Sequence, residues 1–187
     1  MGKIFYSMTI GLAIATIGCI VTYINTSSNI MLTLAITFGT TFYHFVYRLI
    51  VGYGLFAIYH NHMDYSKNWF QERSFEKSLY KAIHVKKWKN KMPTFHPTWF
   101  DISKHSIEDI IMTGCEAEVG HEINVLLSFI PLILIFWFGA PTVFIITSVA
   151  GAIMDLIFVI IQRYNRPRLV AIIKKQAEVN SSLSPCK

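Results

Sequence analysis

A glutamate and a histidine three residues apart, Glu118 and His121, are the pair in this sequence best suited to acid–base chemistry. Residues with this spacing lie on one face of a helix, so the carboxylate can hydrogen-bond the imidazole. A carboxylate at one ring nitrogen fixes the tautomer of a histidine and raises its basicity, as a general base requires. The open alternative is a structural ion pair.

The residues around this pair predict a helix that begins after Ser106. At 100° per residue one stripe of this helix is apolar, then carries the Glu/His pair, and becomes apolar again where a membrane span begins near Ile123. Charged groups among apolar side chains are costly unless they are paired, and inside membrane bundles they usually serve function. Cys115 lies on the same stripe, so a Cys–His acyl-enzyme is a lesser variant.

Three further ionisable residues lie in apolar segments. His44 and Arg48 are four residues apart and share a helix face. Arg48 is expected to extend its charge to the cytoplasmic surface, whereas His44 is interpreted as a satisfied core histidine. Asp155 needs a partner, which His44, Arg48 or His121 can supply.

Metal binding is the weaker interpretation of the seven histidines. His60, His62 and Asp64 are close in sequence, and Glu118 with His121 resembles one half of a di-iron bundle site. The second half of such a site is missing, and the sequence contains no HExxH motif. No metal site is predicted.

The composition points to a membrane protein. The 187 residues are 53% hydrophobic and 15% charged, which excludes an ordinary soluble domain, a disordered chain and a disulfide scaffold. Apolar blocks at about 4–24, 30–50, 123–139 and 142–162 approach the roughly 20 residues that a transmembrane helix needs. We predict an all-α integral membrane protein with four transmembrane helices in a single membrane domain, residues 1–187. The first block is interpreted as a retained helix rather than a signal peptide.

The basic residues predict the orientation. Of the 17 Lys and Arg, only Lys3 and Arg48 lie outside residues 59–122 and 163–187. The positive-inside rule therefore puts both termini, segment 59–122 and the basic tail 163–187 in the cytoplasm. The net charge of +6 suits anionic lipids or an anionic cytosolic ligand, and no nucleic-acid-binding motif accompanies it. No disulfide is expected, because all cysteines lie in the membrane or on its reducing side: Cys19, Cys115 and Cys186.

The cytoplasmic segment 59–122 contains two further features. Ser74 is expected to cap an amphipathic helix that runs to about Ile83 and lies flat in the interface. Its two faces are expected to be an apolar side with Phe75, Leu79, Tyr80 and Ile83, and a water-facing side with Glu76, Lys77 and Lys81. The second feature is a basic cluster in residues 84–91, where four lysines surround one tryptophan: Lys86, Lys87, Trp88, Lys89 and Lys91. It is either a lipid headgroup anchor or a phosphate cradle for a donor such as a coenzyme A thioester.

The segment Gln162–Leu169, which follows the last span and reads QRYNRPRL, is the most specific motif. We refer to it as the basic signature. It closely resembles the C-terminal signature of the glycosyl-4,4'-diaponeurosporenoate acyltransferase family. The segments Phe75–Lys77, Val85–Lys89 and Ala117–His121 resemble other motifs of this family in the same order. Its members are small bacterial membrane enzymes that attach a fatty acyl chain to the sugar of a carotenoid glycoside.

The resemblance implies O-acyl transfer at the cytoplasmic face of the bacterial cell membrane. The donor would be a thioester such as acyl-CoA, the acceptor a hydroxyl of a carotenoid glycoside or glycolipid, and His121, oriented by Glu118, the general base. Basic side chains would hold the donor phosphates, and the polar groups of the basic signature would stabilise the oxyanion. The expected substrate-binding residues are Lys86, Lys87, Trp88, Lys89, Arg163, Tyr164, Asn165, Arg166, Arg168, Asp155 and His44. Membrane lipids are further expected partners, no other cofactor is expected, and a homo-oligomer is left open.

Departures from the family pattern leave the acceptor open. The family stretch usually reads Glu-Thr-x-Arg-Ala-Glu-x-x-His-Trp, whereas here Glu116 replaces the Arg and Glu122 replaces the Trp. In the last span, Asp155 stands where the family commonly has Asn, and Ile157 replaces a proline. Two rival functions also remain. One is a lipid-binding scaffold or transporter subunit without catalysis, and the other is a membrane hydrolase or metalloenzyme that uses the same Glu/His pair.

Overall fold

The computed structural model describes residues 2–183, and this part of the chain contains helices, turns and no strand. Cys186 and the end of the predicted basic tail lie outside the described residues. The chain forms two compact units, Met1–Gly54 with Gly120–Ile157 and Leu55–Val119 with Phe158–Lys187. The predicted all-α class is confirmed.

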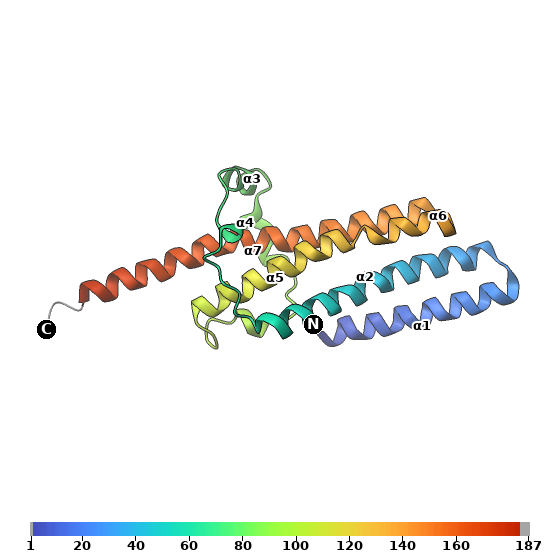
Figure 1. Ribbon diagram of the computed structural model, residues 1–187, viewed down its shortest axis with the longest axis horizontal. Coiled ribbons are helices and arrows are strands. Elements are labelled where there is room, and N and C mark those ends of the chain that lie inside the picture. The colour runs from blue at the N-terminus through green and yellow to red at the C-terminus, as the bar shows by residue number, and fades with distance from the viewer. Residues whose placement is uncertain (1, 184–187) are drawn as a thin grey trace. The chain divides into compact units, whose positions relative to one another are not determined.

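The first unit is made of long helices (Figure 1). Two of them, α1 and α2, run antiparallel, with the ring of Phe5 stacked on Phe45 at a centroid distance of 4.5 Å. The hydroxyl of Tyr6 contacts that of Tyr53, which fits the same pairing. The unit contains α1 (Gly2–Thr26), most of α2 (Asn29–Tyr59), the end of α5 (Ile107–Leu127), η4 (Ile130–Leu134), α6 (Ile135–Phe138) and the start of α7 (Pro141–Leu183).

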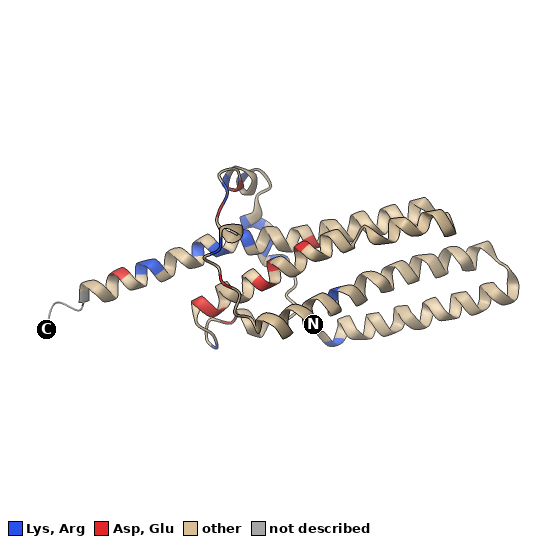
Figure 2. Cartoon of the chain, in the orientation of Figure 1, with Lys and Arg blue, Asp and Glu red and all other residues tan. Residues whose placement is uncertain are grey.

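Apolar side chains cover the outside of these helices instead of filling a core. Ile4, Ile14 and Ile24 on α1 are all more than 60% exposed. The hydroxyl of Thr16 donates to the carbonyl of Leu12, so such threonines need no water. Figure 2 shows almost no charge along α1 and α2. Four helical segments are long and apolar enough to cross a membrane, as predicted: Gly2–Thr26, Asn29–Tyr59, Ile107–Phe138 and Pro141–Ser182.

The third and fourth apolar segments differ in detail from the predicted spans. The third is not one continuous α-helix, because α5 ends at Leu127 and a 3-10 turn, η4, follows around Pro131. Proline has no N–H for an α-helical hydrogen bond. The fourth continues beyond residue 162, and α7 runs through Pro167 to Leu183. The first part of the predicted basic tail is therefore helical.

The second unit surrounds parts of α5 and α7 with short elements. These are η1 (Asn68–Phe70), α3 (Glu76–Ala82), α4 (Val85–Trp88), η2 (Lys89–Lys91) and η3 (Pro97–Phe100). One buried apolar cluster contains Met63, Phe70, Ile111 and Cys115, and a second contains Tyr80, Val85 and Tyr164. The short elements are held against α5 and α7 by these two clusters.

The start of α5 agrees with its prediction. The Ser106 hydroxyl accepts a hydrogen bond from the Asp109 backbone N–H at 3.0 Å, and the Asp109 carboxylate accepts from the Ser106 N–H at 3.1 Å. This reciprocal capping satisfies two N–H groups that lack helical partners. The helix that carries Glu118 and His121 therefore begins where the sequence predicts.

The cap of α3 and the environment of Glu76 were predicted wrongly. Phe75 is the N-cap, no side chain caps the helix, and Ser74 therefore does not fill that role. Glu76, which was expected to face water, is only 3% exposed, whereas Lys77 and Lys81 are exposed as expected. The cause is the ion pair that Glu76 forms with Arg163, a residue far away in sequence.

Candidate active site

His121 on α5 and Asp155 on α7 form a carboxylate–imidazole pair in the first unit. The Nδ1 atom of His121 lies 2.9 Å from Oδ1 of Asp155. The Asp155 side chain is 1% exposed, whereas that of His121 is 26% exposed. The prediction that Asp155 takes a partner among the three basic candidates is confirmed. The arrangement is that of an imidazole whose tautomer is fixed by a buried carboxylate.

Arg48 on α2 binds the other oxygen of the same carboxylate. Its Nη2 atom lies 2.5 Å from Oδ2 of Asp155 and 3.2 Å from the carbonyl oxygen of Gly151. The expectation that Arg48 extends to the surface is wrong, because its side chain is only 10% exposed. A carboxylate buried this deeply needs a counter-charge, and Arg48 supplies it.

His44 belongs to a chain of polar contacts beside this pair. Its Nδ1 atom lies 3.2 Å from the Tyr47 hydroxyl, which is 2.7 Å from the hydroxyl of Ser128. Ser128 donates to the carbonyl of Asn124 at 2.8 Å. His44 is buried, as a core histidine should be, but its Nε2 atom has no hydrogen-bond partner among the residues that the structure describes. Its role in substrate binding stays a prediction.

Replacing Gly151 by Ala is expected to lower the free energy of unfolding by about 1–2 kcal/mol, the cost of overpacking less the gain in helix propensity. A β-carbon at this position would lie 3.0 Å from Nδ1 of His44 and 3.3 Å from Nη2 of Arg48. Neither side chain can retreat easily, because both are held by the hydrogen bonds described above. Denaturant unfolding in detergent measures the effect.

The matched control is Gly52→Ala on α2, where an added β-carbon meets nothing within 4 Å. This variant should gain about 0.5–1 kcal/mol from the higher helix propensity of alanine. Equal stability of the two variants would mean that His44 and Arg48 are not held as described.

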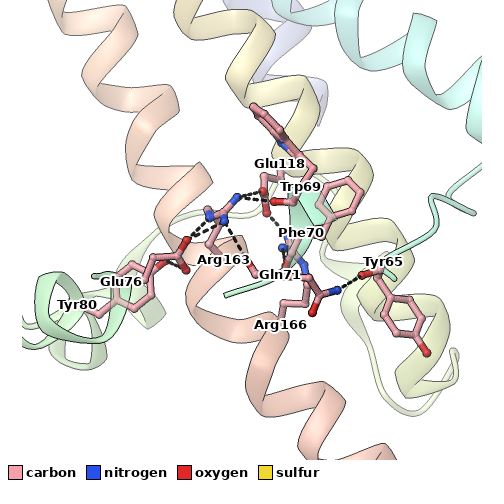
Figure 3. Close-up of polar contacts among 9 residues, drawn as sticks. All are labelled: Tyr65, Trp69, Phe70, Gln71, Glu76, Tyr80, Glu118, Arg163 and Arg166. Atoms are coloured by element: carbon pink, nitrogen blue, oxygen red, sulfur yellow. Dashed lines mark hydrogen bonds and ion pairs between the residues drawn. The ribbon is translucent and has the colours of Figure 1, made fainter. Parts of the chain in front are cut away.

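Glu118 lies in the second unit and accepts hydrogen bonds from two arginines of the basic signature (Figure 3). Its Oε1 atom is 2.8 Å from Nη1 of Arg163, and its Oε2 atom accepts from Nη2 of Arg166. The Glu118 side chain has no exposed surface. Arg166 also donates to the carbonyl of Phe70 at 2.7 Å. The buried carboxylate of Glu118 therefore holds the basic signature against α5.

All three nitrogen atoms of the Arg163 guanidinium donate hydrogen bonds within the protein. Nε and Nη2 face Oε1 of Glu76 at 2.9 and 2.7 Å, and Nη1 faces Glu118. The remaining donors reach the carbonyl oxygens of Trp69 and Gln71, both at 3.3 Å (Figure 3). A guanidinium has five N–H donors, and the five contacts of this one reach four acceptor atoms, because Oε1 of Glu76 accepts twice. Arg163 therefore has protein partners in place of the expected donor phosphates.

These contacts assign different partners to the two residues of the predicted Glu/His pair. The carboxylate found at Nδ1 of His121 is Asp155, and the carboxylate of Glu118 is paired with Arg163 and Arg166. The orientation of His121 by Glu118 stays a prediction.

The other predicted binding residues divide into two groups. Lys89 donates to Oδ1 of Asn165 at 2.7 Å, Trp88 donates to the carbonyl of Ile83 at 2.9 Å, and Tyr164 is buried. These residues hold α4 and η2 to α7. Lys86, Lys87 and Arg168 form the second group and line a pocket, to which Tyr164 of the first group also contributes.

The structure also describes the metal and nucleophile candidates. Within residues 2–183, no three His, Cys, Asp or Glu side chains are grouped so that they could hold a metal ion. His60 and His62 line a cavity of about 280 Å³ with Asp109. Cys115 has no exposed surface and lies in an apolar cluster, which does not suit an acyl-enzyme.

The sequence analysis missed Glu76, Tyr47 and Ser128 as members of the polar networks. A signal existed for Glu76, which is the central residue of the family-like segment Phe75–Lys77. For Tyr47 the only signal was its place one residue before Arg48. Ser128 carried none, because a serine in an apolar helix usually bonds its own backbone.

The fold and site define a helical protein with four helical segments long and apolar enough to cross a membrane, an imidazole paired with a buried carboxylate, and a basic region. Residues 66–175 match the family described as glycosyl-4,4'-diaponeurosporenoate acyltransferase, CrtO, and the chain belongs to this family. The family predicted from the basic signature is confirmed. Comparisons with curated proteins and with solved structures gave no match. The matched range includes Glu118, His121 and Asp155, and it excludes His44 and Arg48.

Proposed function

We propose that this protein is a membrane O-acyltransferase. It moves a fatty acyl group from a cytosolic thioester donor to a hydroxyl of a lipid-like acceptor such as a carotenoid glycoside or glycolipid. Membership of the acyltransferase family supports the reaction class. The four long apolar helices support a membrane setting in which a lipid-like acceptor is present at high concentration.

The observation that carries this proposal is the contact of His121 with Asp155. Asp155 keeps the proton on Nδ1, so that Nε2 is the basic nitrogen. Nε2 takes the proton of the acceptor hydroxyl, and the oxygen attacks the thioester carbonyl carbon. The new C–O bond forms and the C–S bond breaks, and the thiolate leaves with the proton from the imidazolium. His121 is the catalytic residue in this scheme, and Asp155 is a positioning residue.

The proposal includes an orientation. The spans lie in the bacterial cell membrane with both termini and residues 59–122 in the cytoplasm, because the Lys and Arg residues are concentrated in the segments that this orientation puts inside. Exposed apolar residues of α3, such as Phe75 and Leu79, then contact membrane lipids at the inner surface. A thioester made in the cytosol reaches the protein from that side.

Replacement of His121 by Gln is expected to lower acyl transfer at least about 10²-fold, the lower end of the range for loss of a general base. The assay incubates membranes that contain the protein with a labelled acyl thioester and follows label in the lipid fraction. His105→Gln is the control, because His105 is an exposed histidine. Unchanged transfer in His121→Gln would refute the assignment of the base. Label released as free fatty acid, with none in lipid, would indicate a hydrolase instead.

A further inference from the structure

A pocket of about 740 Å³ in the second unit is lined by eleven residues, of which five are Lys or Arg and one is a histidine. Its volume lies within the range of about 300–1,000 Å³ that is typical of small-molecule sites. One carboxylate, Glu72, is part of the lining. The basic lining residues are Lys77, Lys81, His84, Lys86, Lys87 and Arg168.

The basic lining residues lie on α3, α4 and α7 and in the turn between α3 and α4, and these three helices pack against one another. Lys77 and Lys81 lie on α3, Lys86 and Lys87 on α4, and a left-handed turn at His84 (φ 53°) joins the two helices. Val85, at the start of α4, is fully buried and packs with Tyr80 of α3 and Tyr164 of α7. The cations are therefore presented by fixed backbone.

Arg168 is the cation whose position is best defined. Its Nη1 atom donates to the carbonyl of Tyr164, and its guanidinium carbon lies 3.5 Å from the centre of the Tyr164 ring. A side chain that is already ordered loses less conformational entropy when it binds a ligand. Lys77 pairs with Glu72 at 3.3 Å, but its side chain is 78% exposed, so this pair is weak and easily exchanged.

Positively charged side chains that line one pocket repel one another, and a bound anion would offset this repulsion. Lys89 lies outside the lining, and its pKa is below the usual value, first because of burial and second because of the charge of Arg168. A ligand with several phosphate groups would satisfy the lysines and the arginine together. Arg163 and Arg166 do not belong to this set, because both are paired with buried carboxylates.

We propose that this pocket binds the phosphates of a coenzyme A thioester, namely its pyrophosphate and the 3'-phosphate of its adenosine. The proposal rests on the proposed function, since it assigns the donor of that reaction to a site. The observations favour a small polyanion over a single lipid phosphate or an acidic protein, because the cations line a pocket from three elements, α3, α4 and α7, and outnumber what one phosphate needs.

The test measures binding of coenzyme A to the full-length protein in phosphatidylcholine nanodiscs by calorimetry. The double variant Lys86→Gln/Lys87→Gln should raise the dissociation constant at least about tenfold, the effect of losing one or two charge-assisted hydrogen bonds. The control Lys104→Gln/Lys175→Gln removes the same charge outside the pocket and should change it less than about threefold. Equal effects of the two double variants would overturn the proposal.

A second measurement uses the wild-type protein alone, so it stands even if a variant fails to fold. Dephospho-coenzyme A lacks only the 3'-phosphate and should bind about tenfold more weakly than coenzyme A. Equal affinities would overturn the role of that phosphate. The site would also be reassigned if nanodiscs with phosphatidylglycerol abolish coenzyme A binding, or if an acyl carrier protein binds and coenzyme A does not.

The two proposals can fail separately. His121→Gln should bind coenzyme A as tightly as the wild-type protein, because His121 does not line the pocket. If the wild-type protein binds coenzyme A but transfers no acyl group, the proposed function is wrong and the assignment of the pocket to coenzyme A still holds. Full acyl transfer from coenzyme A thioesters by Lys86→Gln/Lys87→Gln at low donor concentration would remove the pocket assignment alone.

Discussion

Replacement of Glu118 by Gln is expected to lower the free energy of unfolding by about 3–5 kcal/mol, the cost of removing one partner from a buried ion pair. Glu118 has no exposed surface, and its carboxylate is the shared acceptor of Arg163 and Arg166. Arg166 is itself only 6% exposed, so its charge would remain buried with its carboxylate lost. Denaturant unfolding of the purified protein in detergent measures this change.

The control for this prediction is Glu178→Gln, which removes a carboxylate from an exposed position on α7 and should change stability by less than about 0.5 kcal/mol. A further variant, Glu118→Leu with Arg166→Met, replaces the buried pair by apolar side chains. It should be more stable than Glu118→Gln, because the charge of Arg166 is removed together with its partner and Arg163 keeps its ion pair with Glu76. A loss below about 1 kcal/mol in Glu118→Gln would contradict the described burial.

The two ion-pair networks differ in how far the sequence could predict them. Glu76 was expected to face water because its neighbours Lys77 and Lys81 define a polar helix face. Its partner Arg163 is 87 residues away, and no local pattern contains that information. For Asp155 the sequence did limit the partners, because few basic residues lie in the apolar segments. An isolated charge in a span must find one of them.

The helices themselves were predictable for a similar reason. Apolar blocks of about 20 residues without charge have few stable conformations other than a helix in a membrane. The residues at which these helices end were less predictable. Pro131 interrupts the third segment and Pro167 is accommodated inside α7, although both prolines lack the same N–H. Which of two prolines breaks a helix depends on packing around it, and a single sequence does not contain that packing.

Replacement of Asp155 by Asn is expected to lower the rate constant of acyl transfer by about 10⁴-fold, the loss seen when an orienting carboxylate of a catalytic histidine becomes an amide. The amide can donate its N–H₂ to Nδ1 of His121 and so favour the tautomer with the proton on Nε2. That nitrogen could then no longer accept the proton of the acceptor hydroxyl. The affinity for coenzyme A should not change, so the effect is on kcat and not on donor binding.

The comparison variant is Arg48→Lys, which disturbs the same buried ion pair but keeps the charge and the carboxylate at Nδ1. Both variants should lose stability, whereas only Asp155→Asn should change the tautomer of His121, which ¹⁵N NMR of histidine-labelled protein in nanodiscs reports directly. This separation matters because a purely structural Asp155 would affect both variants alike. An unchanged tautomer together with normal transfer in Asp155→Asn would remove Asp155 as the positioning residue. Glu118 would then again be the candidate for the residue that orients His121.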